Sequence, residues 1–199
     1  MKRFVAVIDI DTTLANNDAR AELLQKHCVV CGGPKTHGVR SVCPTCLIET
    51  DDNIAQESWD IFLRPDLLAL DLPVRKGVDA IRRMRKLDME FHFITGRNEG
   101  LRPVTEEWLR QYVGWDSSRE ELMMRGPEDR NTAASVYKES ALHRLVELRG
   151  LQDAAFIFFE DDPWVFRMYA KYGICVKCPE GWEHFCPEAA RSLENVWHR

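Results

Sequence analysis

Residues 4–14 read FVAVIDIDTTL, an apolar run that ends in a cluster of polar side chains. The five apolar residues Phe4–Ile8 are typical of a strand that is buried on both faces of a parallel sheet. Two carboxylates and two hydroxyls follow the run directly, those of Asp9, Asp11, Thr12 and Thr13. Because open α/β sheets bind ligands beyond the carboxyl ends of their strands, this stretch predicts a first strand that leads into a functional site.

Further apolar runs repeat the pattern along the chain. Four of them predict strands, the last one more weakly, at Phe91–Ile94, Leu122–Met124, Ala155–Phe159 and Ile174–Val176. Segments with helical periodicity lie between the runs, at 78–84, 104–113, 136–146 and 163–172. Strands that alternate with helices predict an α/β protein with a Rossmann-like, doubly wound parallel sheet.

Residues 15–70 do not fit this alternation. They contain two short helical candidates, at 19–26 and 54–63, with four cysteines between them. We therefore predict a core of residues 1–14 and 71–199, with residues 15–70 inserted as a cap after the first strand. So small an insert buries little core of its own, and a bound metal would stabilise it.

The composition excludes several classes of protein. The chain has 199 residues, is 45% hydrophobic and 30% charged, and carries a net charge of −5. These values are typical of a globular protein and argue against an overall basic surface that coats nucleic acid. No apolar run is long enough to span a membrane, and acids interrupt the N-terminal run too early for a signal peptide. We expect a cytoplasmic protein.

The seven cysteines support the same compartment, because an odd number without an export signal favours reduced thiols. Cys28-x2-Cys31 and Cys43-x2-Cys46 have the spacing of zinc-ribbon knuckles. Four thiolates predict a closed, tetrahedral and structural Zn²⁺ site, with unpaired thiols or a redox pair as the alternatives. The other three cysteines predict either core thiols or a second zinc site, at Cys175, Cys178 and Cys186.

Polar side chains also follow the later strands. Thr95, Gly96 and Arg97 come after the second run, Lys138 opens the helix after the third, and 160–162 (Glu160, Asp161, Asp162) follow the fourth. Carboxylates packed this closely repel one another unless a cation joins them, and hard oxygen ligands suit Mg²⁺. With a lysine and hydroxyls beside it, the set predicts a phosphoryl-transfer site. The alternative is that these acids merely end strands.

Asp9-Ile-Asp-Thr-Thr, Thr95, Lys138 and the acids at 160–162 occur in this order, and together they resemble the four motifs of the haloacid dehalogenase (HAD) superfamily. The resemblance implies that Asp9 is the nucleophile, and that Asp11 is the general acid and later the base. It implies that Thr95 and Lys138 hold phosphoryl oxygens, with Thr13 in a supporting role. Mg²⁺ would be bound by Asp9, the Asp11 main-chain carbonyl and an acid of the fourth motif. Thr12 departs from the glycine common in the family, and a positive φ would strain it.

A closer resemblance covers residues 91–178, on four strings that begin at Thr95, Met124, Val136 and Phe159. They are similar to the 3'-phosphatase domain of the phage polynucleotide kinase/3'-phosphatases. This likeness implies that Gly96 and Arg97 contact phosphate or substrate. It also implies that Asp129 and Arg130 line or brace the site. The metal ligand of the fourth motif is then Asp161, with Glu160 or Asp162 as the other candidate.

The sequence therefore predicts a Mg²⁺-dependent phosphomonoesterase that removes 3'-phosphates from DNA or RNA ends. A phosphatase of nucleoside monophosphates is the alternative substrate reading, and a zinc-ribbon module that binds nucleic acid or protein is the non-enzymatic one. No Gly-x4-Gly-Lys-Ser/Thr phosphate loop occurs in the chain, so a kinase activity would require a separate kinase partner, and a ligase is a further possible partner.

Overall fold

The structure is a computed structural model that describes residues 3–26 and 63–196. The four cysteines predicted to bind zinc, Cys28, Cys31, Cys43 and Cys46, lie outside the described residues. The chain divides into two compact units: Met1–Ala15 with Pro73–Arg199, and Asn16–Leu72. The first of these, called the core below, contains every predicted catalytic residue.

The core is built on a five-stranded sheet in the order β5-β4-β1-β6-β7, and all neighbouring strands are parallel. The strands are β1 (Phe4–Ile8), β4 (Glu90–Asn98), β5 (Leu122–Arg125), β6 (Ala155–Glu160) and β7 (Gly173–Lys177). The predicted α/β fold with a parallel sheet is thereby confirmed. All five residues of β1 are buried, as expected for a central strand covered on both faces.

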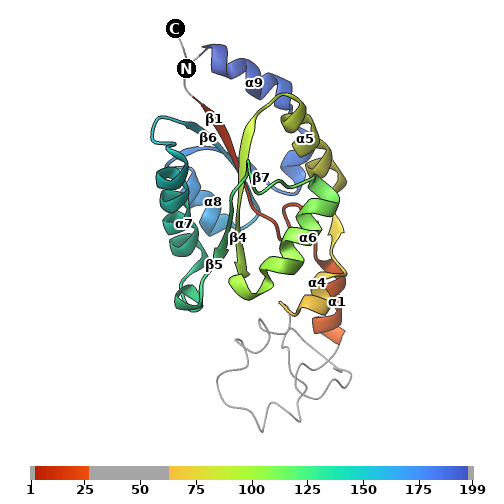
Figure 1. The fold of residues 1–199 in the computed structure, drawn as a ribbon. Helices are drawn as coiled ribbons and strands as arrows, with labels where there is room; N and C mark the ends of the chain where they lie inside the picture. Colours follow the sequence, from red (N-terminus) through yellow and green to blue (C-terminus); the bar gives the residue numbers. More distant parts are fainter. Residues whose placement is uncertain (1–2, 27–62, 197–199) are drawn as a thin grey trace. The chain divides into compact units, whose positions relative to one another are not determined.

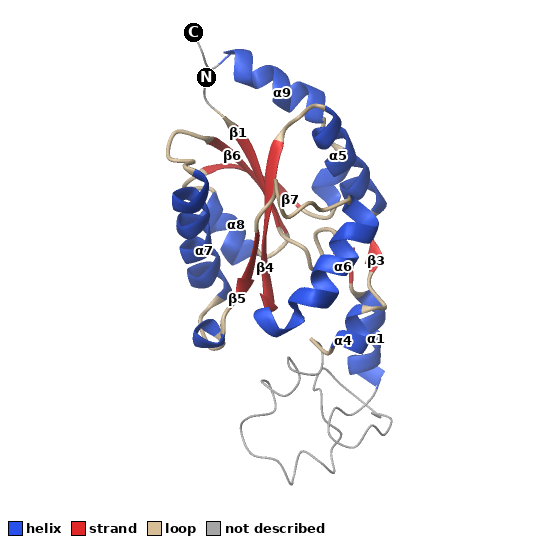
Figure 2. Ribbon diagram, in the orientation of Figure 1, coloured by secondary structure: helices blue, strands red, loops and turns tan. Residues whose placement is uncertain are grey.

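Helices cover both faces of this sheet (Figures 1 and 2). On one face lie α5 (Arg75–Lys86), α6 (Arg102–Val113) and α9 (Pro187–Val196), and on the other lie α7 (Ala134–Arg149) and α8 (Pro163–Tyr169). The short 3-10 turns η1 (Glu99–Leu101), η2 (Pro127–Asp129) and η3 (Glu180–Glu183) connect them. In α5 the buried residues recur every three or four positions, as an amphipathic helix requires; they are Gly77, Val78, Ala80, Ile81 and Met84.

The strand order places a topological switch point at β1. The chain runs from β1 to its neighbour β4 on one side and later returns to its other neighbour, β6. The connections therefore diverge at the carboxyl end of β1, which is where open α/β sheets leave a crevice for ligands. The segment after Ile8 lies at this point.

Strand β4 extends beyond the predicted run. Ile94 pairs with Met123 and Asn98 pairs with Arg125, so four steps along β4 match only two along β5. This irregularity contains Thr95, Gly96 and Arg97. Bulges of this kind re-aim side chains next to active sites.

The second unit contains α1 (Asp18–Lys26) and α4 (Pro65–Leu68). The short strands β2 (Ala15–Asn16) and β3 (Leu72–Pro73) form a separate two-stranded sheet. Within the unit, Arg20 and Asp71 form a fully buried ion pair, with Nε–Oδ1 at 2.6 Å and Nη2–Oδ2 at 2.9 Å. In the described part of the chain, no helix is both long and apolar enough to cross a bilayer.

Candidate active site

The loop of residues 9–15, called the nucleophile loop below, follows β1 in a tight turn. The Asp9 amide donates to the Phe159 carbonyl at 3.0 Å and so joins the loop to the end of β6. The amides of Leu14 and Ala15 both donate to the Ile10 carbonyl at 2.8 Å. Thr12 has a φ of 62°, which costs a β-branched residue roughly 1–2 kcal/mol. The departure noted in the sequence is therefore a strained position.

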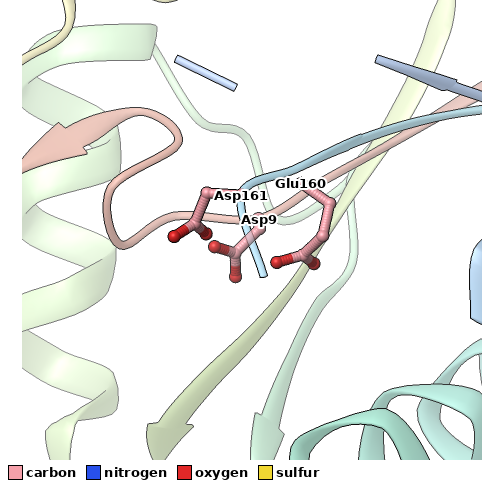
Figure 3. Close-up of side chains that lie close together, drawn as sticks. All are labelled: Asp9, Glu160 and Asp161. Atoms are coloured by element: carbon pink, nitrogen blue, oxygen red, sulfur yellow. The ribbon is translucent and has the colours of Figure 1, made fainter. Parts of the chain in front are cut away.

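Three carboxylates meet at the carboxyl ends of β1 and β6. Side-chain oxygens of Asp9, Glu160 and Asp161 lie within 4.8 Å of one another (Figure 3). Among the described residues, this is the one group of acids, histidines and cysteines so closely placed. Thr13 connects two of its members, because its hydroxyl lies 3.3 Å from Asp9 Oδ2 and 3.4 Å from Asp161 Oδ1.

Lys138 supplies the counter-charge to this cluster. Its ammonium donates to Asp9 Oδ1 at 2.8 Å and to Glu160 Oε2 at 2.7 Å. All three side chains are almost completely buried, so they interact in a medium less polar than water. An ammonium has three protons to donate, and a third is available to a substrate oxygen.

Burial sets the protonation behaviour of the cluster. It raises the pKa of Asp9 from 3.8 to about 7, against the opposing effect of Lys138, while the Glu160 charge raises it further. The pKa of Asp161 rises to about 6, first through burial and then through the charge of Asp9. Burial also raises the pKa of Glu160. For Lys138 burial acts to lower the pKa, but Asp9 and Glu160 outweigh it and hold the pKa well above its usual value.

The donor set fits Mg²⁺, which prefers carboxylate oxygens and keeps several positions open. Asp9, Glu160 and Asp161 are the carboxylates that could hold the metal. Both oxygens of Glu160 already accept hydrogen bonds, Oε2 from Lys138 and Oε1 from the Asp162 amide at 3.2 Å. The oxygens of Asp9 likewise accept from Lys138 and Thr13, so Glu160 and Asp9 together orient the lysine.

These raised pKa values predict how metal-free stability depends on pH. An unfolded aspartate titrates near 3.8, so between about pH 4 and pH 7 the folded state binds more protons than the unfolded state. Stability then falls as pH rises through this window. Saturating Mg²⁺ should raise the melting temperature more at pH 8 than at pH 5, because protons compete with the metal at low pH. Thermal denaturation at the two pH values tests this, and an equal Mg²⁺ effect at both would contradict it.

Arg97 contacts the predicted general acid, Asp11. Arg97 is 1% exposed. Its guanidinium donates two hydrogen bonds to Asp11, Nε to Oδ2 and Nη2 to Oδ1, each 2.9 Å long. Nη1 lies 3.4 Å from the Thr105 hydroxyl. The phosphate or substrate contact expected of Arg97 stays a prediction, and in this structure the side chain holds the predicted general acid.

Thr95 and Gly96 lie in the β4 irregularity. Thr95 is fully buried, and its hydroxyl accepts a hydrogen bond from the Arg97 amide at 3.2 Å. Ile8, the last residue of β1, pairs with Phe93, so Thr95 follows two residues beyond the part of β4 that pairs with β1. Apart from Gly96 itself and its two neighbours in the chain, no heavy atom of the described residues lies within 4 Å of the position that a Gly96 Cβ would occupy.

The structure separates the acids of the fourth motif. Asp162 is the N-cap of α8, and its Oδ1 accepts from the amides of Trp164 at 2.7 Å and Val165 at 3.1 Å. It is therefore not part of the three-carboxylate cluster, which contains Glu160 and Asp161.

The two supporting residues after β5 are arranged differently. Asp129 ends η2, and its carbonyl accepts a hydrogen bond from Arg125 Nη1 at 2.7 Å, so it braces the loop through its backbone. Arg130 is exposed. Cys175, Cys178 and Cys186 are free thiols, and within the described ranges none of them belongs to a group of three or more possible metal ligands; Cys186 Sγ donates to Glu188 Oε2 at 3.3 Å.

The sequence did not single out Thr105 or Trp182, which contact Arg97 and Thr13 respectively. Thr105 belongs to the turn of α6 that packs behind the β4 irregularity, and no motif marks it. Trp182 donates its indole N–H to the nucleophile loop from the far end of the chain. Neither contact has a local signature.

The comparisons agree with this fold. No protein-family model matches the sequence, and neither does any curated protein. A haloacid dehalogenase-like hydrolase from Streptococcus pneumoniae superposes with a TM-score of 0.56 at 12% identity, covering 88% of this chain and 84% of that one. A HAD-superfamily hydrolase of subfamily IA from Geobacter sulfurreducens gives 0.55 at 16%, covering 88% and 86%. CbbY from Rhodobacter sphaeroides, in complex with phosphate, gives 0.51 at 14%, covering 88% and 85%. The core therefore has the fold of HAD-superfamily hydrolases.

Proposed function

We propose that this protein is a Mg²⁺-dependent phosphomonoesterase that works through an aspartyl-phosphate on Asp9. The observation that carries the proposal is the buried cluster of Asp9, Glu160 and Asp161 with Lys138 hydrogen-bonded to Asp9. A site with only a structural role would not require three carboxylates that repel one another at the carboxyl end of the sheet. The cluster lowers the stability of the fold unless a cation and a substrate bind there.

In the first step an oxygen of Asp9 attacks phosphorus, and the bond from phosphorus to the ester oxygen breaks. Asp11 gives its proton to the departing oxygen. Arg97 donates hydrogen bonds to both carboxylate oxygens of Asp11. Arg97 must therefore weaken or give up one of these bonds when Asp11 is protonated. Lys138 and Thr95 hold the non-bridging phosphoryl oxygens.

In the second step a water molecule attacks phosphorus and the bond to Asp9 breaks. Asp11, now a carboxylate, takes the proton of that water, and inorganic phosphate leaves. Mg²⁺ bound by Asp9 and Asp161 would neutralise negative charge on the transferring group. Glu160 keeps the ammonium of Lys138 in place throughout.

We propose phosphorylated nucleic-acid 3' ends as the substrate, with free nucleoside monophosphates as the second candidate. The four strings that begin at Thr95, Met124, Val136 and Phe159 support the first choice. Trp164 supports a substrate with a flat ring. It is 68% exposed in the first turn of α8, three residues after Asp161, and the Arg167 guanidinium carbon lies 5.1 Å from its ring centroid. Exposed indoles paired with arginine are platforms on which bases stack.

Phosphate release decides among these functions. The substrates are a 3'-phosphorylated oligonucleotide, a deoxynucleoside monophosphate and a small aliphatic phosphate monoester, each with Mg²⁺ and with EDTA. Turnover of the oligonucleotide above the other two supports the 3'-end assignment, and preference for the mononucleotide supports the second candidate. If none is hydrolysed under any metal condition, the non-enzymatic zinc-ribbon reading is favoured.

Trp164→Ala tests the stacking platform separately. Loss of one stacked base costs about 1–3 kcal/mol, so kcat/KM for the base-bearing substrate should fall about tenfold more than for the aliphatic monoester. Trp164→Tyr keeps an aromatic ring and should retain most of the preference. Equal losses on both substrates would remove Trp164 from substrate recognition without affecting the phosphatase assignment.

A further inference from the structure

Trp182 connects the far end of the chain to the nucleophile loop. It lies in η3 and is 3% exposed. Its indole Nε1 donates to the Thr13 carbonyl at 2.9 Å, although the two residues are 169 positions apart in the sequence. Most buried indole N–H groups find such a partner.

The residue that Trp182 holds is the one that joins two members of the acid cluster. The Thr13 hydroxyl lies between Asp9 Oδ2 and Asp161 Oδ1, at 3.3 and 3.4 Å. Thr13 follows directly on Thr12, the residue with the unfavourable positive φ. A hydrogen bond to the Thr13 carbonyl therefore holds the peptide unit between Thr13 and Leu14, one residue after the strained position, and so limits movement of the backbone that carries the Thr13 hydroxyl.

The indole ring also contacts the other side of the site. It stacks on Phe159 with ring centroids 4.1 Å apart and an interplanar angle of 7°. Phe159 immediately precedes Glu160, and its carbonyl accepts a hydrogen bond from the Asp9 amide. One side chain thus touches both segments that carry the cluster, the nucleophile loop and the end of β6.

Helix α5 leaves room for this arrangement. A Cβ added at Gly77 would lie 2.9 Å from Trp182 Nε1 and 2.9 Å from Leu14 Cδ2. Such contacts are too close for any side chain at this position. A glycine here permits the indole and the nucleophile loop to meet against the helix.

We propose that Trp182 is a positioning residue of the active site, which holds Thr13 so that Asp9 and Asp161 keep the separation that Mg²⁺ requires. The inference rests on the proposed metal site but adds a residue that is outside its motifs. Trp182 acts through the Thr13 carbonyl and the Phe159 ring.

Trp182→Phe removes the N–H and keeps an aromatic ring that can stack. The matched control is Trp115→Phe, because Trp115 is also buried and its Nε1 has no hydrogen-bond partner among the described residues. Both variants are titrated with Mg²⁺, with the melting temperature and the intrinsic fluorescence as readouts. We expect the apparent Mg²⁺ affinity of Trp182→Phe to be three- to tenfold weaker than that of Trp115→Phe, as loss of one buried hydrogen bond predicts.

Kinetics give a second readout that simple destabilisation would not reproduce. For Trp182→Phe we expect kcat to fall at low Mg²⁺ and to recover towards the wild-type value at saturating Mg²⁺, with the KM for substrate little changed. Gly77→Ala crowds both the indole and the Leu14 side chain of the nucleophile loop, and it should also weaken Mg²⁺ binding. Equal Mg²⁺ affinity in Trp182→Phe and Trp115→Phe would overturn the proposal. If the wild type itself does not bind Mg²⁺, the proposed function fails instead.

Discussion

Asp9→Asn is expected to abolish phosphate release while making the metal-free protein more stable. The asparagine amide is a poor nucleophile, so the loss of turnover should be on the order of ten-thousandfold. Without metal at pH 8, the native carboxylate is ionised in a buried site that raises its pKa to about 7. Each pKa unit corresponds to about 1.4 kcal/mol, and part of the gain is lost with the hydrogen bond to Lys138. We expect a net stabilisation of about 2 kcal/mol.

Two assays on one variant check this expectation: phosphate release with Mg²⁺, and thermal denaturation in EDTA. Asp153→Asn is the matched control, since Asp153 is an exposed aspartate and should change neither quantity. Opposite effects on activity and stability distinguish a carboxylate kept for catalysis from one kept for the fold. An Asp9→Asn protein that still turns over substrate, or that is less stable than the wild type in EDTA, would refute the assignment.

The strands, and the acids that follow them, could be predicted because their signals are local. Phe4–Ile8 is apolar at every position, as a central parallel strand must be, and the acids follow where the strand ends. The same reasoning placed Thr95, Lys138 and Glu160 at one edge of the sheet. Because all the strands are parallel, their carboxyl ends lie at the same edge of the sheet, and the residues that follow them meet there.

The register of the fourth motif was left open by the sequence, although helix capping could have decided it. Asp162 is followed by Pro163, and an aspartate at the N-cap with proline at the first helical position is a common helix start. A residue whose oxygen binds the first amides of a helix is not available to a metal. Asp161 and Glu160 are then the acids that remain for the cluster.

The role of Arg97 could not be predicted because it depends on the irregularity in β4. Between Ile94 and Asn98 the pairing with β5 slips, and this changes the directions of the side chains. In a regular strand, Arg97 would lie on the same face of the sheet as Thr95, because the two residues are two positions apart. Its bidentate contact with Asp11 comes from tertiary structure, as does the contact between Trp182 and Thr13. Pairs this distant in the sequence leave no periodic signal.

Lys138→Met should cause the largest loss of stability of any single substitution in the core site. Lys138 is 4% exposed and bonds two buried carboxylates, those of Asp9 and Glu160. Methionine has similar length but no charge, so both acids lose their partner in a poorly polar site. Breaking a buried ion pair from one side costs about 3–5 kcal/mol, and activity should be lost as well.

The pH dependence of this loss distinguishes charge from packing. Without the ammonium, the pKa values of Asp9 and Glu160 rise further, so protonation at pH 5 relieves the repulsion. Denaturant unfolding in EDTA should therefore show a smaller destabilisation at pH 5 than at pH 8. The triple variant Lys138→Met, Asp9→Asn, Glu160→Gln removes all three charges and should regain stability without regaining activity.

Lys171→Met is the control. Lys171 is an exposed lysine whose Nζ lies 3.6 Å from Glu139 Oε1, a pair worth at most about 1 kcal/mol. A pH-independent loss in Lys138→Met would mean that the lysine contributes packing and not the counter-charge on which the phosphoryl-transfer proposal depends.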